Sequence, residues 1–592
     1  FDMYSAENAG LIKFDFLGLK TLTVINNTQK LVRKLNEDFD IEKISFEDQK
    51  VFDLLSSGKT VGLFQVESAG MREALIQMKP NHIEDIIALV ALYRPGPMSN
   101  IPTYNDCKHG RQKPDYLHPL LEEILKPTYG VIIYQEQVMQ IAQKLSGFTA
   151  GQADLLRRAM GKKKRAELEK QKLGFIAGAL KNGIAKDVAA SIFLKIEPFA
   201  EYGFNKSHAA AYAIISYQTA FLKTYYPKEF IAASMTMDLS NQNKLSEFYE
   251  ELKRLNVDVT RPDINECYAD FKTQDDKFYY ALGGIKAVGY EAISNVIEER
   301  TKNGNFKSIN DFLNRINPKD MNKLQLEGLV KAGAFDNLNN NRQSLFNSIP
   351  NFILKTKNIY ENKSANQIGL FTEEEETQND IINDIEDWKF EERLSKEFEA
   401  VGFFISDHPL NQFTEIFDDY KIINYSKFNL EDETKESNIA ATLLKLQERK
   451  TAKGNSYAVL KLTDLSSVFE IFIFSDVLEL NREILKEGNS LILTLVKNIS
   501  NDENRFKRIN VQKIASLKDL FNSPIKEVLF EVKSNQEVDE ISKLINENGN
   551  TTVNINFLID DKNVKFTLKN PRNLDRKSLN LLRKREISST IS

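Results

Sequence analysis

Near the start of the chain, Lys13 and Asp15 stand two residues apart inside an apolar stretch, residues 10–20. The residue types of this stretch predict a buried strand. The two-residue period of a strand puts Lys13 and Asp15 on one face, and Phe14 and Phe16 on the other. A carboxylate beside an ammonium group suits a metal ion and an anionic substrate. A buried ion pair, or charges on an edge strand, would produce the same pattern, so both interpretations stay open.

The second candidate group is strongly basic. Residues 157–172 contain eight lysines and arginines and only two acidic residues. On a helix, Arg157 and Arg158 project about 100° apart and can contact two sides of one polyanion. Gly161 is expected to end this helix, and the bases that follow are Lys162, Lys163 and Lys164. The segment is either a phosphate-binding element, through the paired donors of arginine and the point charges of lysine, or an ordinary solvated face.

Polar residues also gather at the predicted start of a helix that runs to Tyr225. Asn205, Lys206, Ser207 and His208 are consecutive there. The free N–H groups of a helix N-terminus and the helix dipole favour anions. An Asn or Ser at this place is equally an ordinary N-cap, and both interpretations stay open.

Two further motifs suggest contacts with other molecules. Residues 283–290 form a glycine-containing turn after a predicted hairpin (268–282), and backbone N–H groups in such a turn can hold a duplex phosphate, although the signal is weak. Residues 357–395 are polar and then acidic, which predicts a linker. Inside it, the amide and the adjacent apolar pair of a short docking motif are Gln367, Leu370 and Phe371. The alternative is a hydrophobic pair that packs on the chain's own domains.

The elements expected to position these groups are mixed. Helices are predicted at residues 21–35, 46–56, 71–78, 83–93 and 228–255, with short strands at 62–68 and at the start of 129–150. Residues 438–515 contain five short β runs, which indicate a small barrel of OB type. Such barrels often bind single-stranded nucleic acid, although many are only interaction modules. Residues 516–592 are expected to form an α+β unit with a basic tail.

Composition sets broad limits. The 592 residues are enough for about three to five domains of roughly 100–200 residues each, and the net charge of −5 excludes a uniformly basic nucleic-acid binder. Two cysteines, Cys107 and Cys267, argue against a disulfide framework and a cysteine zinc site. Asp38 and Asp40 form an Asp-x-Asp pattern, but their place in a charged turn argues against a metal site. No apolar run approaches the ~20 residues needed to span a bilayer, so a cytoplasmic protein is expected.

Taken in order, several stretches resemble one family. They are residues 10–20 and the motifs GLFQVES, ALYRPGPM, TYGVIIYQEQVMQIAQ, LLRRAMGKKK, YGFNKSHAAAYA and RPDINE. Together they resemble the bacterial C-family replicative DNA polymerases, the catalytic alpha subunits of DNA polymerase III. The resemblance is strong in residues 1–345 and more diffuse in residues 410–592.

The resemblance implies roles for the candidate residues. Asp15 matches the third of three palm aspartates that hold two divalent metal ions, expected to be Mg²⁺, and Lys13 matches a lysine that contacts phosphate. Arg157 and Arg158 match the arginines of the fingers that hold the incoming triphosphate. The motif near the sugar of the incoming nucleotide is matched by Asn205 and His208.

Contacts with DNA and with partner proteins are implied as well. Residues 283–290 match a helix-hairpin-helix turn that grips duplex DNA, in which Ala287 stands at a usual glycine position. The residues expected to contact DNA are Lys286, Val288, Gly289, Lys162, Lys163 and Lys164. The internal motif that binds the beta sliding clamp is matched by Gln367, Leu370 and Phe371. The OB-like region would meet single-stranded template, and residues 516–592 would bind the clamp-loader subunit tau.

The implied fold class is multidomain α+β. The expected parts are the end of a beta-type nucleotidyltransferase palm (1–20), large mostly helical fingers (21–265), a helix-hairpin-helix clamp-binding domain (266–356), a linker with the clamp-binding motif (357–395), a connector (396–437), an OB-type β-barrel (438–515) and a small α+β C-terminal domain (516–592). The family's first two metal aspartates precede Asp15 and have no match in this chain. Its N-terminal phosphoesterase-like domain has none either. The chain is therefore expected to be a C-terminal fragment that is inactive by itself.

The implied reaction is DNA-directed DNA synthesis. A primer 3′-hydroxyl attacks the alpha phosphorus of a dNTP, two metal ions assist, and pyrophosphate leaves. The expected partners are primer–template DNA, dNTPs, the clamp, tau and a proofreading exonuclease bound through the N-terminal domain, with no membrane. The alternative is a non-catalytic DNA- and clamp-binding protein derived from a polymerase. The intact residues that favour the polymerase are Lys13, Asp15, Arg157 and Arg158.

Overall fold

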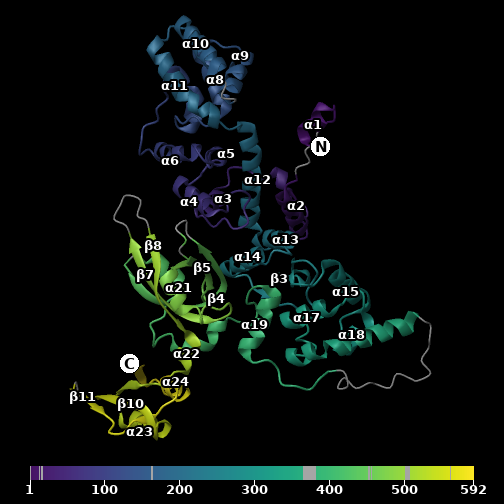
Figure 1. The fold of residues 1–592 in the computed structure, drawn as a ribbon, viewed down its shortest axis with the longest axis vertical. Coiled ribbons are helices and arrows are strands. Elements are labelled where there is room, and N and C mark those ends of the chain that lie inside the picture. Colours follow the sequence, from purple (N-terminus) through teal and green to yellow (C-terminus); the bar gives the residue numbers. More distant parts are fainter. Residues whose placement is uncertain are drawn as a thin grey trace. The chain divides into compact units, whose positions relative to one another are not determined.

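The computed structural model describes residues 2–12, 14, 18–161, 165–364, 382–431, 433–450, 454, 456–499, 507–559 and 562–591. The chain divides into two compact units, both drawn in Figure 1. The first contains Phe1–Gly284 and Val288–Phe306, and the second contains Ile285–Ala287 and Lys307–Ser592.

The first unit is mostly helical. Its helices are α1 (Met3–Asn8), α2 (Lys20–Val32), α3 (Gln49–Ser56), α4 (Ala69–Met78), α5 (Ile83–Leu92), α6 (Ile101–Lys108), α7 (Glu122–Leu125), α8 (Gln135–Ser146), α9 (Ala150–Gly161), α10 (Arg165–Lys181), α11 (Lys186–Tyr202), α12 (Lys206–Tyr225), α13 (Pro227–Met237), α14 (Gln242–Arg254) and α15 (Tyr290–Asn303). Along the described ranges of the whole chain, no helix has the length and apolar character needed to cross a membrane.

Helices α8 to α11 gather into one bundle (Figure 1). Val138, Ile141 and Leu145 recur at helical spacing along α8, and all three are buried. They belong to one apolar cluster with Phe175 of α10 and Phe193 of α11, whose rings lie 5.4 Å apart. This core supports α9, the helix that ends in the basic segment.

The long helix α12 lies against α5, α3, α2 and α13. Its buried Ser216 hydroxyl donates to the Phe64 carbonyl at 2.9 Å. Near its C-terminus, the buried Lys223 ammonium donates to the carbonyl oxygens of Lys59 and Val61 at 2.9 and 2.7 Å. These bonds hold residues 59–64 against α12 as a turn.

Several sequence-based expectations need correction here. Residues 62–68 form turns and not a strand, because Gly62 and Gln65 adopt left-handed backbone conformations with φ of 78° and 59°. Before α8 there is only an isolated parallel bridge between Tyr134 and Phe204. The helix expected over residues 228–255 is two helices, α13 and α14, separated at 238–241.

The predicted hairpin is confirmed. Strands β2 (Lys272–Gln274) and β3 (Lys277–Tyr279) pair antiparallel, and β1 (Val259–Thr260) pairs parallel with β3. Asp275 and Asp276 connect β2 to β3 with φ of 50° and 64°. Two consecutive left-handed residues suit a tight hairpin turn.

The second unit begins with helices. They are α16 (Ile309–Arg315), α17 (Lys323–Ala332), α18 (Arg342–Ser364), α19 (Phe390–Val401) and α20 (Tyr425–Leu430). Arg342 on α18 is buried and pairs with the buried carboxylate of Glu397 on α19 at 3.3 Å. Helices α18 and α19 extend into the segment expected to be a linker. One reason is that Trp388 is buried and packs on Phe346 with ring centroids 5.5 Å apart.

A five-stranded antiparallel sheet follows, as the five β runs predict. Its strands are β4 (Glu436–Lys450), β5 (Ser456–Thr463), β6 (Val468–Phe474), β7 (Ser490–Ile499) and β8 (Lys507–Ser516), with α21 (Ser475–Asn481) between β6 and β7. The pairing order is β6-β5-β4-β7-β8. The outermost strands β6 and β8 also approach each other, with Cα atoms within 8 Å. Alternating residues of β6 are buried in the core of this sheet.

The last part of the chain is the expected α+β unit. Its elements are α22 (Leu517–Asn522), β9 (Glu527–Val532), α23 (Asn535–Leu544), β10 (Asn546–Ile559), β11 (Lys562–Thr567), β12 (Arg572–Asn573), α24 (Arg576–Lys584) and β13 (Ser588–Ile591). The sheet order is β11-β10-β9-β13, and β9 pairs parallel with β10. Helices α23 and α24 contribute buried Ile541, Leu579 and Leu582 to its core.

Candidate functional site

Arg157 and Arg158, on the last turns of α9, both contact the carboxylate of Asp154. The Nε and Nη2 atoms of Arg157 donate to Asp154 Oδ1 at 2.9 and 2.7 Å. The Nε atom of Arg158 lies 2.7 Å from Asp154 Oδ2. The hydrogen bond from Arg157 is the main reason that the pKa of the Asp154 carboxyl lies below its ordinary value. The two guanidinium groups therefore converge on one anion, as the sequence suggests for a polyanion.

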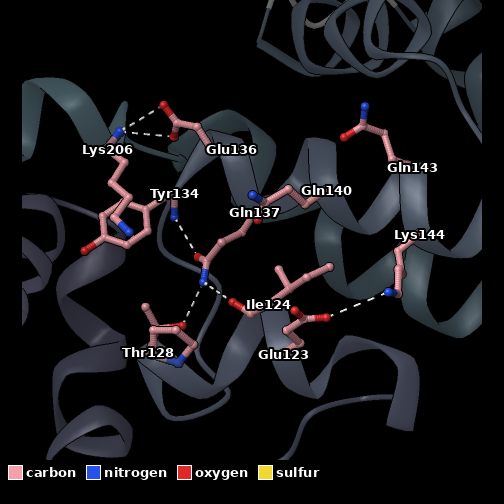
Figure 2. Close-up of a pocket in the computed structure, with 11 residues that line it drawn as sticks. Glu123, Ile124, Thr128, Tyr134, Glu136, Gln137, Gln140, Gln143, Lys144 and Lys206 are labelled. Atoms are coloured by element: carbon pink, nitrogen blue, oxygen red, sulfur yellow. Dashed lines mark hydrogen bonds and ion pairs between the residues drawn. The ribbon is translucent and has the colours of Figure 1, made fainter.

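The first two residues of α8 connect this arginine pair to the N-terminus of α12. Gln135 Oε1 accepts from Arg157 Nη1 at 3.4 Å. The next residue, Glu136, accepts from Asn205 Nδ2 at 2.9 Å and from the Lys206 backbone N–H at 3.0 Å. Figure 2 shows Glu136 and Lys206 facing each other. Donors from α9 and α12 thus lie on either side of the start of α8.

Asn205 is the N-cap of α12, since its Oδ1 accepts from the His208 backbone N–H at 2.8 Å. Both interpretations of this motif are therefore present together, because the cap residue also binds the carboxylate of Glu136. Lys206 and His208 are exposed. The Lys206 ammonium lies 5.4 Å from the centre of the Tyr134 ring.

Flat side chains stack beside this N-terminus. The guanidinium of Arg94 lies 4.5 Å from the centre of the Phe204 ring, and partial burial lowers the pKa of Arg94. The rings of Phe204 and His208 are 5.3 Å apart, and those of His208 and Tyr212 are 4.5 Å apart. The imidazole of His208 is thus held between two aromatic rings while one edge stays exposed.

A cavity of about 610 Å³ opens next to these residues, lined by α8, the segment before it and Lys206. Gln137 lies in its wall and points toward Thr128 (Figure 2). Its Oε1 accepts from the Tyr134 N–H at 3.0 Å, and its Nε2 donates to Thr128 Oγ1 at 2.8 Å. Gln137 therefore fixes the backbone that leads into Gln135 and Glu136.

The turn before α15 shows a strained residue at the position where glycine is usual. Ala287 has a φ of 66°, which is the left-handed region. Lys286 is exposed, but its backbone N–H donates to the Ala400 carbonyl at 2.8 Å and is not free for a phosphate. The Val288 side chain is buried, so any contact of Val288 with DNA would come from its backbone. Gly289 is the exposed N-cap position of α15.

Eight of the expected site residues lie outside the described residues. They are the phosphate contact and metal ligand Lys13 and Asp15, the DNA contacts Lys162, Lys163 and Lys164, and the docking residues Gln367, Leu370 and Phe371. Their described neighbours Leu11, Ile12 and Phe14 are 67%, 77% and 72% exposed and lie in no strand. The expected buried strand is therefore wrong at these positions, because no strand of the described ranges pairs with them.

Asp40, in the turn after α2, is the N-cap of a short 3-10 helix at Ile41–Lys43. Asp40 Oδ1 accepts from the Glu42 backbone N–H at 3.1 Å, and this bond lowers the pKa of the Asp40 carboxyl. Within the ranges given above, no group of three or more His, Cys, Asp or Glu side chains is placed to hold a metal ion.

Comparison with known proteins matches two parts of the chain to family models. Residues 21–183 match the bacterial DNA polymerase III alpha subunit finger domain, and residues 256–345 match a helix-hairpin-helix motif. A DNA polymerase III subunit alpha of Caulobacter vibrioides is 42% identical over 86% of this chain and 44% of the relative. Proteins of the same name from Rickettsia bellii and Escherichia coli are 40% and 39% identical over 95% and 83% of this chain, and over 51% and 44% of their own lengths.

Over most of its length, the chain is thus similar to DNA polymerase III alpha subunits. It spans about half the length of the curated relatives it matches. The match to the alpha-subunit finger domain contains Gln135, Glu136, Asp154 and both arginines, whereas the N-terminus of α12 lies beyond it. The helix-hairpin-helix match contains the turn at 283–290.

Sequence reasoning missed three residues of this candidate site. Asp154 could have been found, because an acid three and four positions before two arginines is a standard helical ion-pair spacing. Glu136 and Gln135 carry no such signal. The partners of Glu136 are about 70 positions away in the sequence, and they meet it only in the folded chain, next to the bridge between Tyr134 and Phe204.

Proposed function

We propose that this protein is a DNA-directed DNA polymerase, the catalytic subunit of a bacterial replicative holoenzyme. The observation that carries the proposal is the identity of about 40% to proteins named DNA polymerase III subunit alpha, over most of this chain. The reaction adds a dNMP to a primer 3′-hydroxyl and releases pyrophosphate. The expected domain division, from the palm end at 1–20 to the C-terminal domain at 516–592, is part of this proposal.

The site described above would bind the incoming dNTP. Arg157 and Arg158 would hold the triphosphate, because guanidinium groups that already converge on a carboxylate can converge on phosphate oxygens. Asn205 and His208 would lie near the sugar, with the imidazole oriented by its two neighbouring rings. A preorganised set of donors lowers the cost of ordering side chains when the nucleotide binds.

A divalent metal ion, expected to be Mg²⁺, would supply charge neutralisation at the reacting phosphates. Asp15 is the proposed ligand in this chain and Lys13 the neighbouring phosphate contact. The described residues contain no group of three or more His, Cys, Asp or Glu side chains placed to hold a metal ion.

DNA would contact several parts of the chain. The proposed duplex contacts are Lys286, the backbone at Val288 and Gly289, and the lysines Lys162, Lys163 and Lys164. The five-stranded sheet would act as an OB-type barrel that meets single-stranded template. Its outward face supports this, since Tyr457 pairs with Phe474 across β5 and β6, and the exposed Phe472 lies on the same side. Arg508 lies 5.6 Å from the centre of the Phe474 ring, so a stacking surface and a positive charge occur together.

The resemblance to the polymerase family also suggests which proteins bind this chain. Gln367, Leu370 and Phe371 are proposed to bind the beta sliding clamp, and residues 516–592 the tau subunit. A proofreading exonuclease is a further proposed partner. Replacing Leu370 and Phe371 by alanine should reduce processive synthesis with the clamp and leave short extension intact.

Primer extension by the complete gene product tests the proposed function. Arg157→Ala/Arg158→Ala should raise the KM for dNTP at least about tenfold and leave duplex affinity unchanged, because each charge-assisted bond contributes roughly 1.5–3 kcal/mol. Arg111→Ala is the matched control, since the Arg111 side chain is 58% exposed and that of Arg158 is 62% exposed. Asp15→Asn should abolish incorporation. A wild-type protein that binds duplex and clamp but never extends a primer would reject the polymerase and support the non-catalytic alternative.

A further inference from the structure

The carboxylate of Asp154 occupies the donors that a substrate phosphate would need. Three of its contacts are charge-assisted bonds of 2.7 to 2.9 Å, two from Arg157 and one from Arg158. Each oxygen of the carboxylate faces a different guanidinium. The two arginines are on adjacent positions of one helix and would otherwise project about 100° apart. In this structure both guanidinium groups turn toward the Asp154 carboxylate.

These bonds are weak enough to exchange. The side chains of Asp154, Arg157 and Arg158 are 28%, 29% and 62% exposed, and ion pairs with this exposure contribute little to stability because water screens them. Asp154 brings one negative charge against two positive ones, so the cluster keeps a net positive charge. A triphosphate brings more charge and more acceptor oxygens, and it can replace the carboxylate without leaving a guanidinium unpaired.

The start of α12 shows the same arrangement independently. There the Glu136 carboxylate accepts from Asn205 Nδ2 and from the Lys206 backbone N–H. Gln135 Oε1 links this position to Arg157. The Asp154 carboxylate thus binds the arginine pair of α9, and the Glu136 carboxylate binds the donors at the N-terminus of α12.

We propose that the Asp154 carboxylate stands between Arg157 and Arg158 where a substrate phosphate binds, and that nucleotide binding displaces it. The inference rests on the proposed function, in which this arginine pair takes the triphosphate of a dNTP. It predicts that Asp154 competes with phosphate, so removing its charge strengthens binding. A merely structural helical ion pair predicts the opposite sign, because its loss would disorder the arginines.

Calorimetric titration of the purified protein with inorganic tripolyphosphate tests this. Asp154→Asn should lower the Kd about three- to tenfold, because two exposed ion pairs no longer compete. Asp154→Ser is a second neutral variant and should act in the same direction. Asp154→Glu keeps the charge and should retain the wild-type Kd within about twofold. Asp187→Asn, an exposed residue in the first turn of α11, is the control for the same change in net charge.

The outcomes separate the inference from the proposed function. If Asp154→Asn weakens binding, or changes it only as much as Asp187→Asn does, the displacement of Asp154 is overturned. If Arg157→Ala/Arg158→Ala leaves the tripolyphosphate affinity unchanged, the assignment of the phosphate site fails as well. If neither the wild type nor Asp154→Asn binds tripolyphosphate, both are rejected, whereas primer extension judges the polymerase activity independently.

Discussion

Replacing Ala287 by glycine should stabilise the turn that precedes α15. Ala287 is exposed and has a φ of 66°. This left-handed conformation costs a residue with a Cβ atom about 1–2 kcal/mol. Glycine removes that cost, but it also increases the entropy of the unfolded chain by roughly 0.4–1 kcal/mol. The difference is a net stabilisation of about 0.5–1 kcal/mol.

Hydrogen exchange of the backbone amides at the start of α15 measures this effect locally. A local measurement suits a chain with several cores better than one global unfolding curve. A gain of about 0.5–1 kcal/mol slows exchange about two- to fivefold. The matched control is Ala292→Gly inside α15, where glycine should cost about 1 kcal/mol and speed exchange. If Ala287→Gly speeds exchange as Ala292→Gly does, the strain assigned to Ala287 is refuted.

Arg342→Met should cost about 3–5 kcal/mol in chemical denaturation of the second unit, because it leaves a buried carboxylate without its cation. Arg393→Met, at a side chain that is 29% exposed, should cost less than about 1 kcal/mol, and equal losses would contradict the burial argument. Burial raises the pKa of the Cys267 thiol to about 12, so iodoacetamide at pH 8 should modify it more than about 100-fold more slowly in the folded than in the unfolded protein. Since this pKa lies above the ordinary value of 9.0, the stability that Cys267 contributes is present below pH 9 and is lost as the pH rises toward 12. Phe472→Ala/Phe474→Ala should weaken single-stranded DNA binding about tenfold in fluorescence anisotropy and leave duplex binding unchanged, and an unchanged single-strand Kd would reject the stacking surface.

Local spacing predicted most of the elements. The helices at 71–78 and 83–93 and the hairpin tip at Asp275 and Asp276 are confirmed. Each follows from a signal within a few residues, such as helical periodicity, a proline or a turn pair. The strand expected at 62–68 fails because its apolar pattern carries no information about the left-handed backbone that packing against α12 imposes.

By itself, the sequence determined the resemblance to a polymerase family and the chemical type of the arginine pair. These depend on residue identity and on short-range geometry, which the chain carries wherever it folds. Only the tertiary structure decided that Glu136 meets the N-terminus of α12. This contact joins residues about 70 positions apart, and it exists where the parallel bridge between Tyr134 and Phe204 places the start of α8 beside that N-terminus. The arginine pair and Asp154 lie within one helix and can be found from their spacing, whereas Glu136 joins the candidate phosphate site only when the chain folds.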